Sequence, residues 1–558
     1  MQVRHRRGRA LSDVLAGFGV VVAVLAAAAA ILLPAGRLRS CAMLLALVLV
    51  PALILGDQWH THRIVDLRDH PSRLALLAAG AVAISAALAG VFRRWPITLP
   101  LAIVFALPFR VPLHAGGESA NLLVPLYLVI AGGVLFATAR SWVPARLLPA
   151  GGAAGGTSPE EALATGRAGG SPAATGPAGP ATWVPRLLAL TVVLYGAQVL
   201  YSEDFSKGLQ NVCFFFVPFS LVYALLRDIG WDRKLLALAL WVVGLEAVAF
   251  VAVGTIEHFS RELFWNDQVI RSNEFHTYFR VNSVFWDPNI YGRYLALVSV
   301  VAMSALLWAR ERRTLALLTA LIVVLWLGLF PTYSQSSFVA LLAGLAVLAA
   351  LKWSLRWTLI AVGAFAVLGV LVVLLAGGAS KLSPNRLNVD TSGRANLVSG
   401  GAHLFAQRPL YGYGSGSFPK AYREHVKSRK TPVSVSHTEP VTIAAEQGIV
   451  GLALYAALVV TALWTMASRA GGAAGGTRSE EASATAGPGG SPAATGPARQ
   501  PPIARAAILA TFTALLVHTM AYAGFYEDPI TWVLLAVGVS LVAAESGAAS
   551  SALGRPRS

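Results

Sequence analysis

Long apolar runs are the feature that most limits what this chain of 558 residues can fold into. Runs of roughly 18 or more apolar residues recur from one end to the other, and each is long enough to cross about 30 Å of hydrocarbon as a helix. Only 13% of the residues are charged, about half the share found in soluble domains. The sequence therefore predicts an all-α polytopic membrane protein. The plainest runs are 14–33, 74–91, 236–256, 315–330 and 359–376.

The apolar pattern gives fifteen candidate spans, so we expect about 12–15 transmembrane helices and a large extracytoplasmic loop. The segment at 96–114 is the weakest candidate because Pro100, Pro108 and Arg110 interrupt it. The candidate spans are 13–34, 39–56, 73–92, 96–114, 121–138, 183–201, 211–226, 235–256, 290–308, 314–330, 337–351, 357–377, 438–467, 504–524 and 530–545.

Basic residues in alternate loops set the predicted orientation, since positively charged loops stay in the cytoplasm. Arg140 and the basic segments 227–234 and 310–313 all fall on one side. The loops 257–289 and 378–437 then lie together on the extracytoplasmic side. If all fifteen spans cross, the basic N-terminus also lies outside, which the same rule disfavours.

Two nearly identical low-complexity segments interrupt the apolar pattern. GGAAGGTSPEEALATGRAGGSPAATGPA at 151–178 recurs with few changes at 471–498, and this composition cannot bury a core. We interpret both as cytoplasmic linkers, either tethers or duplicated inserts. The predicted organisation is N-terminal helices at 1–140, a linker at 141–182, central helices at 183–377 with an outer loop at 257–289, the large loop at 378–437, a helix at 438–468, a linker at 469–503, and C-terminal helices with a tail at 504–558.

The net charge of +17 does not indicate a nucleic-acid-binding protein. Much of the positive charge falls in short loops between apolar runs, where it sets topology and contacts anionic lipid. Cys41 and Cys213 both lie inside apolar segments, so neither a disulfide framework nor a thiolate metal site is indicated. The sequence also lacks a HisGluxxHis motif, and we expect no cofactor and no metal ion.

The predicted large loop at 378–437 is basic, although the positive-inside rule gives the reverse for an extracytoplasmic loop. Arginine donates two parallel hydrogen bonds to a phosphate, so the excess of cations favours an anionic ligand at the membrane surface. The alternative is a solvated loop that contacts acidic lipid. The cations are Lys381, Arg386, Arg394, Arg408, Lys420, Arg423, Lys427, Arg429 and Lys430, against the acidic Asp390, Glu424 and Glu439.

His437 ends this loop and is the candidate general base. It precedes Glu439 and Pro440, which suit a helix start, and an imidazole accepts a proton from a hydroxyl near neutral pH. Glu439 or Glu446 could orient the ring. The alternative role is a structural hydrogen bond at a helix mouth. The tract PLYGYGSGS at 409–417 supplies glycines for tight turns and for close approach to a ligand.

The shorter outer loop at 257–289 combines aromatic residues with arginines just before a helix start. The aromatic rings are typical membrane-interface anchors. Asp287 and Pro288 suit a helix N-terminus, where the carboxylate caps free amides. Arg280 has no such local role, and an arginine close to the bilayer must pair or face a polar cavity. Arg280 is therefore a second candidate for anion binding.

These motifs, in this order, resemble the O-antigen ligase and polymerase family of bacterial membrane glycosyltransferases. The family pattern has an arginine before a PheXAspProAsn helix start, a GlyArg pair, a ProLeu-aromatic-GlyXGly tract, and a histidine before GluXGlyXXGly. The matching residues are Arg280, 285–289, 393–394, 409–414, His437 and 446–451. The chain departs from the family at Gln335, where an arginine is common, and at Thr438, where an asparagine is frequent.

The resemblance implies a GT-C-like fold. It also implies an enzyme that transfers glycans from an undecaprenyl-diphosphate donor at the outer face of the bacterial cytoplasmic membrane. Arg280 and Arg394 would hold the diphosphate, and His437 would act as base on an acceptor hydroxyl without a metal ion. The acceptor would be a glycan, a lipid or a protein, and membrane lipids would surround the chain. Further substrate-binding candidates are Asp287, Asn289, Arg408 and Tyr411.

Other functions remain open at this point. A multi-span transporter or flippase of lipid-linked or anionic substrates would place charges near the membrane midplane, whereas only Glu246 stands out within the spans. A peptidoglycan-polymerising protein would be expected to rely on an aspartate in an outer loop. Asp390 is the candidate in this sequence, but its sequence surroundings do not fit that role. A structural role is the third alternative. The motifs do not separate a ligase from a polymerase.

Overall fold

The computed structural model describes residues 2–59, 68–115, 118–142, 180–264, 266–275, 278–377, 394–426, 436–468 and 502–553. Most of both predicted low-complexity linkers lies outside these ranges. The loop residues Lys381, Arg386, Asp390, Gly393, Lys427, Arg429 and Lys430 also lie outside them.

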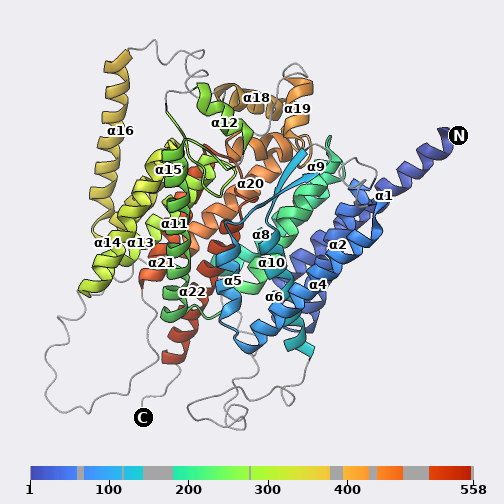
Figure 1. The fold of residues 1–558 in the computed structure, drawn as a ribbon, viewed down its shortest axis with the longest axis horizontal. Coiled ribbons are helices and arrows are strands. Elements are labelled where there is room, and N and C mark those ends of the chain that lie inside the picture. Colours follow the sequence, from blue (N-terminus) through green and yellow to red (C-terminus); the bar gives the residue numbers. More distant parts are fainter. Residues whose placement is uncertain are drawn as a thin grey trace, which may run out of the picture.

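Long α-helices dominate the described structure and lie side by side in a bundle (Figure 1). The first half of the chain forms α1 (Gln2–Leu32), α2 (Arg37–Gln58), α4 (Pro71–Arg94), α5 (Thr98–Ala106), α6 (Val124–Trp142), α8 (Trp183–Val199), α9 (Phe205–Asn211), the π-helical turn η4 (Val212–Phe216), α10 (Val217–Leu226) and α11 (Arg233–Ser260). The second half forms α12 (Asp267–Phe275), α13 (Pro288–Trp308), α14 (Arg312–Leu329), α15 (Gln335–Lys352), α16 (Leu355–Gly377), α18 (Arg394–Gln407), α19 (Phe418–His425), α20 (Glu439–Ala467), α21 (Pro502–Thr519) and α22 (Pro529–Leu553).

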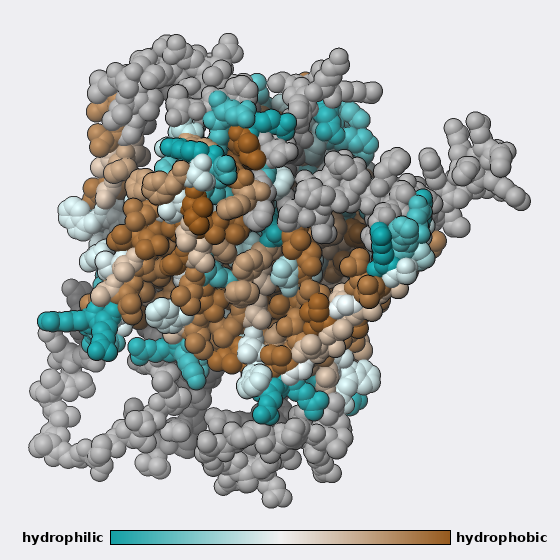
Figure 2. Space-filling model, in the orientation of Figure 1, coloured by the Kyte–Doolittle hydropathy of each residue, from teal (hydrophilic) through white to brown (hydrophobic). Residues whose placement is uncertain are grey.

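The predicted fold class, an all-α polytopic membrane protein, is confirmed. Ten of the described helices are long and apolar enough to cross a membrane. Hydrophobic side chains form a band across the middle of the molecule, and hydrophilic ones gather at both ends (Figure 2). This distribution fits helices that satisfy their own backbone hydrogen bonds within a bilayer. Four shorter apolar stretches accompany the ten: Trp183–Val199, Leu355–Leu368, Ile503–Thr519 and Pro529–Glu545.

The weakest predicted span, 96–114, is not one continuous helix. α5 ends after nine residues, and the chain continues into an antiparallel hairpin of β1 (Val111–Ala115) and β2 (Glu118–Leu122). Pro108 explains the stop, because a proline has no backbone N–H with which to continue the helical hydrogen bonds. The expectation of a helical span there was wrong over its second half.

Close helix contacts hold the second half of the bundle together around α13, α15 and α21. Gly344 of α15 allows this packing, since a Cβ atom there would lie 2.6 Å from Val300 of α13 and 3.2 Å from Ala514 of α21. Small residues at such crossings let membrane helices approach closely enough for good van der Waals contact. These closely packed helices support the loops at the end of the bundle.

The short helices α12, α18 and α19 lie together at one end of the bundle, which we call the cap face (Figure 1). The segments that lead into α13, α20 and α22 meet the same end, because α11, α16 and α21 run toward it. Segments far apart in the sequence therefore meet at the cap face. This arrangement positions the site described next.

Candidate active site

The site begins at the N-terminus of α13, where the predicted cap is confirmed. The Asp287 carboxylate accepts a hydrogen bond from the backbone N–H of Asn289 at 2.6 Å. The Arg280 Nη2 donates to the side-chain oxygen of Asn289 at 3.1 Å, and its Nε donates to the backbone oxygen of Thr332 at 2.9 Å. Asn289 thus links Arg280 to the capped end of α13.

Arg280 keeps its charge in a partly buried position. Burial lowers the pKa of Arg280, the Asp287 carboxylate raises it, and the Arg394 cation lowers it again. The pKa of an arginine starts so high that the group stays protonated in proteins. The Asn273 side chain of α12 holds the Arg280 backbone, accepting from its N–H and donating to its carbonyl oxygen, both at 3.0 Å. Contacts from three segments therefore hold Arg280, one through its backbone and two through its guanidinium.

Arg394 is the first residue of α18 and reaches the turn between α21 and α22. Its Nη1 donates to the backbone oxygen of Ala521 at 3.3 Å. The next residue of that turn, Tyr522, lies beside His437 with a ring-centroid distance of 6.1 Å. Burial raises the pKa of Tyr522, and Asp287 raises it further while Arg394 lowers it. We call the group of Arg280, Asp287, Arg394, His437 and Tyr522 the His437 cluster.

His437 occupies a strained backbone position just before α20. Its φ angle is 62°, in the left-handed region that non-glycine residues rarely adopt. The fully buried Ser436 holds this turn, because its hydroxyl donates to the Thr438 backbone oxygen at 2.7 Å and accepts from the Thr438 N–H at 3.1 Å. The Thr438 hydroxyl donates to the Met520 backbone oxygen at 3.1 Å. The flanking residues therefore position the ring through its backbone.

The surroundings of His437 favour a neutral imidazole. Burial lowers the pKa of His437 below its usual value of 6.5, and the Arg394 guanidinium lowers it further, while Asp287 opposes both. Within the described ranges, no residue forms a hydrogen bond to the ring. At neutral pH the imidazole is therefore uncharged and available to accept a proton.

Glu439 and Glu446, which the sequence suggested as partners for His437, bind other groups. The buried Glu439 carboxylate accepts from two backbone N–H groups of the α21–α22 turn, at 2.7 and 3.1 Å. The buried Glu446 carboxylate accepts from two backbone N–H groups at 416–418, at 2.8 and 3.0 Å. These acids therefore anchor loops on α20, because the buried amides would otherwise lack partners.

The glycine tract at 409–417 lies very close to the backbone of α20. Gly412 and Gly448 have positive φ angles of 67° and 66°, and a Cβ atom on either would collide with backbone of the facing segment. Gly448 interrupts the helical geometry of α20, and the backbone N–H of Ile449 donates to the Pro409 oxygen at 2.7 Å. The glycine tract and the GluXGlyXXGly motif are therefore two sides of one packing contact.

Arg408 and Tyr411, also predicted to bind substrate, belong to a second polar group on the cap face. Arg408 forms an ion pair with Glu203 at 3.1 Å and covers an aromatic ring of the glycine tract at 4.2 Å. Tyr411 is largely exposed, and its backbone oxygen accepts from a tyrosine hydroxyl after α8 at 2.7 Å. Glu203 also accepts from Lys420 through its backbone oxygen and contacts His425 at 3.3 Å. We call the group of Glu203, Arg408, Lys420 and His425 the Glu203 cluster.

The Glu203 cluster is also where metal ligation has to be considered. Glu203, Glu424 and His425 offer ligand atoms that all lie within 4.8 Å of one another. The cations of Arg408 and Lys420 already lie beside Glu203, and a metal ion would be repelled by them. We therefore assign no metal to this group.

Further charged residues at the same end of the bundle were not predicted as site residues from the sequence. Arg293 of α13 and Asp528 before α22 form a buried ion pair at 2.7 Å, and Arg110 acts electrostatically on both. These three residues line a cavity of about 20 Å³, which has room for about one water molecule. A signal for Asp528 was present, since Asp528-Pro529 repeats the AspPro helix start at 287–288.

The fold and the site together define a class of protein: a polytopic membrane protein whose loops gather arginines around a neutral histidine at one end of the bundle. Residues 320–456 match the family model described as O-antigen ligase. This match supports an O-antigen ligase and polymerase family assignment, which confirms the prediction from the motifs, and it supports a glycosyl-transfer enzyme. The matched segment contains Arg394 and His437 and begins after Arg280. No curated protein matches the chain.

Proposed function

We propose that this protein transfers a glycan from an undecaprenyl-diphosphate-linked donor to an acceptor hydroxyl, as a ligase or a polymerase. The observation that carries the proposal is the His437 cluster, in which the turn that holds Tyr522 lies beside the His437 ring and accepts a hydrogen bond from Arg394, and burial and Arg394 lower the pKa of His437. A hydroxyl nucleophile needs a proton acceptor, and a diphosphate leaving group needs charge compensation. The cluster offers both kinds of side chain at one place.

Arg280 and Arg394 are assigned to the diphosphate. Each lies close enough to the other for Arg394 to lower the pKa of Arg280. Two neighbouring like charges repel, and an anionic ligand between them relieves that repulsion. The Nε and Nη2 of Arg280 are committed to Thr332 and Asn289, whereas its Nη1 has no partner in the described structure. Guanidinium groups match phosphate oxygens with paired hydrogen bonds and compensate their charge without a metal ion.

His437 is assigned as the general base. An imidazole nitrogen takes the proton of the acceptor hydroxyl as the hydroxyl oxygen forms a bond to the anomeric carbon. The bond from that carbon to the diphosphate oxygen breaks, and the diphosphate leaves with the electron pair. Attack opposite the leaving group inverts the anomeric configuration. The two arginines stabilise the charge that develops on the leaving oxygen.

We assign the reaction to the extracytoplasmic face of the bacterial cytoplasmic membrane. Arg140 lies in the last turn of α6 and the basic segment 310–313 joins α13 to α14, so both lie at the end of the bundle opposite the cap face (Figure 1). Basic loops stay in the cytoplasm. This distribution supports a cap face, and with it a His437 cluster, turned away from the cytoplasm.

The test is transfer in vitro by the purified full-length protein, with an undecaprenyl-diphosphate-linked glycan as donor. Acceptors are supplied one class at a time: a lipid-linked core sugar, a peptide with side-chain hydroxyls, and a second molecule of the donor. Product with the first two identifies a ligase, and product with the third identifies a polymerase. Failure of all three, together with movement of the donor across vesicle membranes, would overturn the proposal in favour of a transporter.

A further inference from the structure

A large cavity lies at the end of the bundle opposite the cap face, remote from the His437 cluster. It has a volume of about 720 Å³ and is lined by the beginnings of α2, α5 and α11 and the ends of α6 and α10. This volume is within the range of ligand sites, roughly 300–1,000 Å³. Its wall is mostly apolar, with side chains such as Met43, Leu99, Phe136, Leu225 and Leu235.

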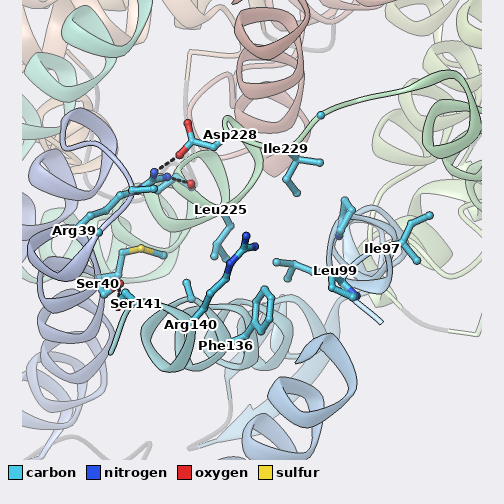
Figure 3. Close-up of a pocket in the computed structure, with 18 of the residues that line it drawn as sticks. Arg39, Ser40, Ile97, Leu99, Phe136, Arg140, Ser141, Leu225, Asp228 and Ile229 are labelled. Carbon is cyan, nitrogen blue, oxygen red and sulfur yellow. Dashed lines mark hydrogen bonds and ion pairs between the residues drawn. The ribbon is translucent and has the colours of Figure 1, made fainter. Parts of the chain in front are cut away.

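Arg140 supplies an uncompensated charge inside this cavity. Its side chain extends from the last turn of α6 into the middle of the space, between Leu225, Leu99 and Phe136 (Figure 3). It forms no hydrogen bond or ion pair with any other residue that the structure describes. Arg140 is exposed within this open space, so an anion that enters the cavity can reach the guanidinium and supply the counter-charge that the described residues do not.

A second arginine in the wall points to the same ligand. Arg39 is 5% exposed, its Nη1 pairs with Asp228, and its Nε is buried with no hydrogen-bond partner. Arg227 also pairs with Asp228, at 3.2 Å, so two cations share one carboxylate. The other acidic group of the wall, Asp232, caps α11 by accepting from the Leu235 N–H at 2.8 Å. The wall itself holds two arginines and two aspartates, and with Arg227, which pairs with Asp228 from outside the wall, three arginines meet two carboxylates.

The N-terminus of α2 adds to the positive electrostatic potential in the cavity. Gly36 and Arg39, which both line the cavity, flank the first turn of this helix. Gly36 provides no side-chain cap, so first-turn amides of α2 carry the positive end of the helix dipole without a protein acceptor. Backbone amides at such a position favour an anionic oxygen.

We propose that this cavity binds an anionic phospholipid, with the phosphate at Arg140 and the acyl chains along the apolar wall. A free phosphate would leave the apolar wall exposed to water, and an uncharged lipid would leave Arg140 without a counter-ion. The position at the ends of membrane-spanning helices puts the cavity at the level of lipid headgroups. The lipid bridges the ends of α2, α6 and α10, and it is independent of the glycan donor.

The test uses the full-length protein, purified in detergent and stripped of lipid, with binding measured by native mass spectrometry and by the shift in thermal unfolding. The probes are dioctanoyl phosphatidylglycerol, dioctanoyl phosphatidylcholine, glycerol 3-phosphate and inorganic phosphate. We expect the phosphatidylglycerol to bind at least about tenfold more tightly than each of the others, because only it carries both a net negative charge and acyl chains. Equal binding of phosphatidylcholine, or displacement by phosphate at similar concentrations, would overturn the proposal.

Two variants test the position of the site. Arg140→Gln should weaken phosphatidylglycerol binding about tenfold, whereas Arg313→Gln, which removes an exposed arginine from the same end of the bundle, should not. Ala137→Phe fills the cavity without changing charge and should abolish the bound lipid species. Unchanged binding in both Arg140→Gln and Ala137→Phe would show that the lipid lies elsewhere.

Discussion

The cap face carries two groups that each contain a histidine, an arginine and an acidic residue, and that differ in how these side chains are paired. In the Glu203 cluster, Glu203 pairs with Arg408 at 3.1 Å and contacts His425 at 3.3 Å. In the His437 cluster, the histidine ring has no hydrogen-bond partner within the described ranges, and after burial it is the Arg394 charge that most lowers its pKa. In the first group the Glu203 carboxylate already pairs with the arginine and contacts the histidine, so only the second group leaves these side chains available to a substrate.

Both groups lie at least partly within the segment that matches the O-antigen ligase family model, residues 320–456. Membership of a motif therefore does not decide whether a residue works on substrate or supports the fold. Arg408 follows α18 by one residue and anchors the glycine tract, whereas Arg394 begins α18 and reaches the His437 cluster. The two arginines differ in what the tertiary structure puts next to them.

The largest expected effect separates the two histidines. His437→Ala should lower transfer by about 10²- to 10⁴-fold, the usual contribution of a general base. His425→Ala should leave transfer unchanged, because His425 is exposed and lies in the Glu203 cluster. The measurement is the initial rate of glycan transfer, with thermal unfolding as a check that both variants are folded. Equal losses in both variants would remove the distinction between the clusters.

The next effect concerns the arginines. Arg280→Ala and Arg394→Ala should each lower kcat/KM for the donor by about 10- to 100-fold, because each removes charge-assisted hydrogen bonds to phosphate. Arg271→Ala is the matched control, since Arg271 is exposed on α12 at the same face. Steady-state kinetics over a range of donor concentrations measure the effect. Normal donor use by both variants would contradict the assigned roles.

A smaller effect tests the residues that support the fold, at the contact between the glycine tract and α20. Gly448→Ala should lower the free energy of unfolding by about 1–3 kcal/mol, because φ is 66° there and the new Cβ would collide with the Leu410 backbone. Gly363→Ala in α16 has no atom within 4 Å of the new Cβ and should change stability little. Denaturant or thermal unfolding of the two variants in the same detergent gives the comparison. A Gly448→Ala protein as stable as wild type would show that the tract and α20 do not pack as described.

The smallest effect is a shift of the pH profile. The base must be neutral to act, so kcat/KM rises with pH through the pKa of His437, which lies below 6.5. Arg394→Gln removes a cation that disfavours the imidazolium, so the pKa and the acid limb should move to higher pH. Asp287→Asn removes an anion that favours the imidazolium, so the limb should move to lower pH. Profiles between about pH 5 and 8 that shift the same way in both variants would show that neither group acts on His437.

Much of the fold was predictable from the sequence because the bilayer imposes a local rule. A run of apolar residues has to form a helix long enough to satisfy its own backbone, and the candidate spans correspond to helices with one exception. That exception, 96–114, contains Pro108, which already argued against a continuous helix. The cap by Asp287 was predictable for the same reason, since a helix start depends on a few neighbouring residues.

The partners of the polar residues were less predictable. Glu439 and Glu446 lie close to His437 in the sequence, yet their carboxylates bind backbone amides from other segments. Tyr522 joined the His437 cluster although it is remote from His437 in the chain. Residues brought together by the packing of α13, α20 and α22 leave no common pattern in the linear sequence.

The sequence by itself determined that the chain crosses a membrane many times and that its polar motifs resemble those of one glycosyltransferase family, because apolar length and motif order are properties of neighbouring residues. Only the tertiary structure decided which arginines pair with carboxylates and which do not, and which histidine ring has no hydrogen-bond partner in the described part of the chain. The reason is physical: burial and charge depend on distances between segments, and those distances are set by helix packing.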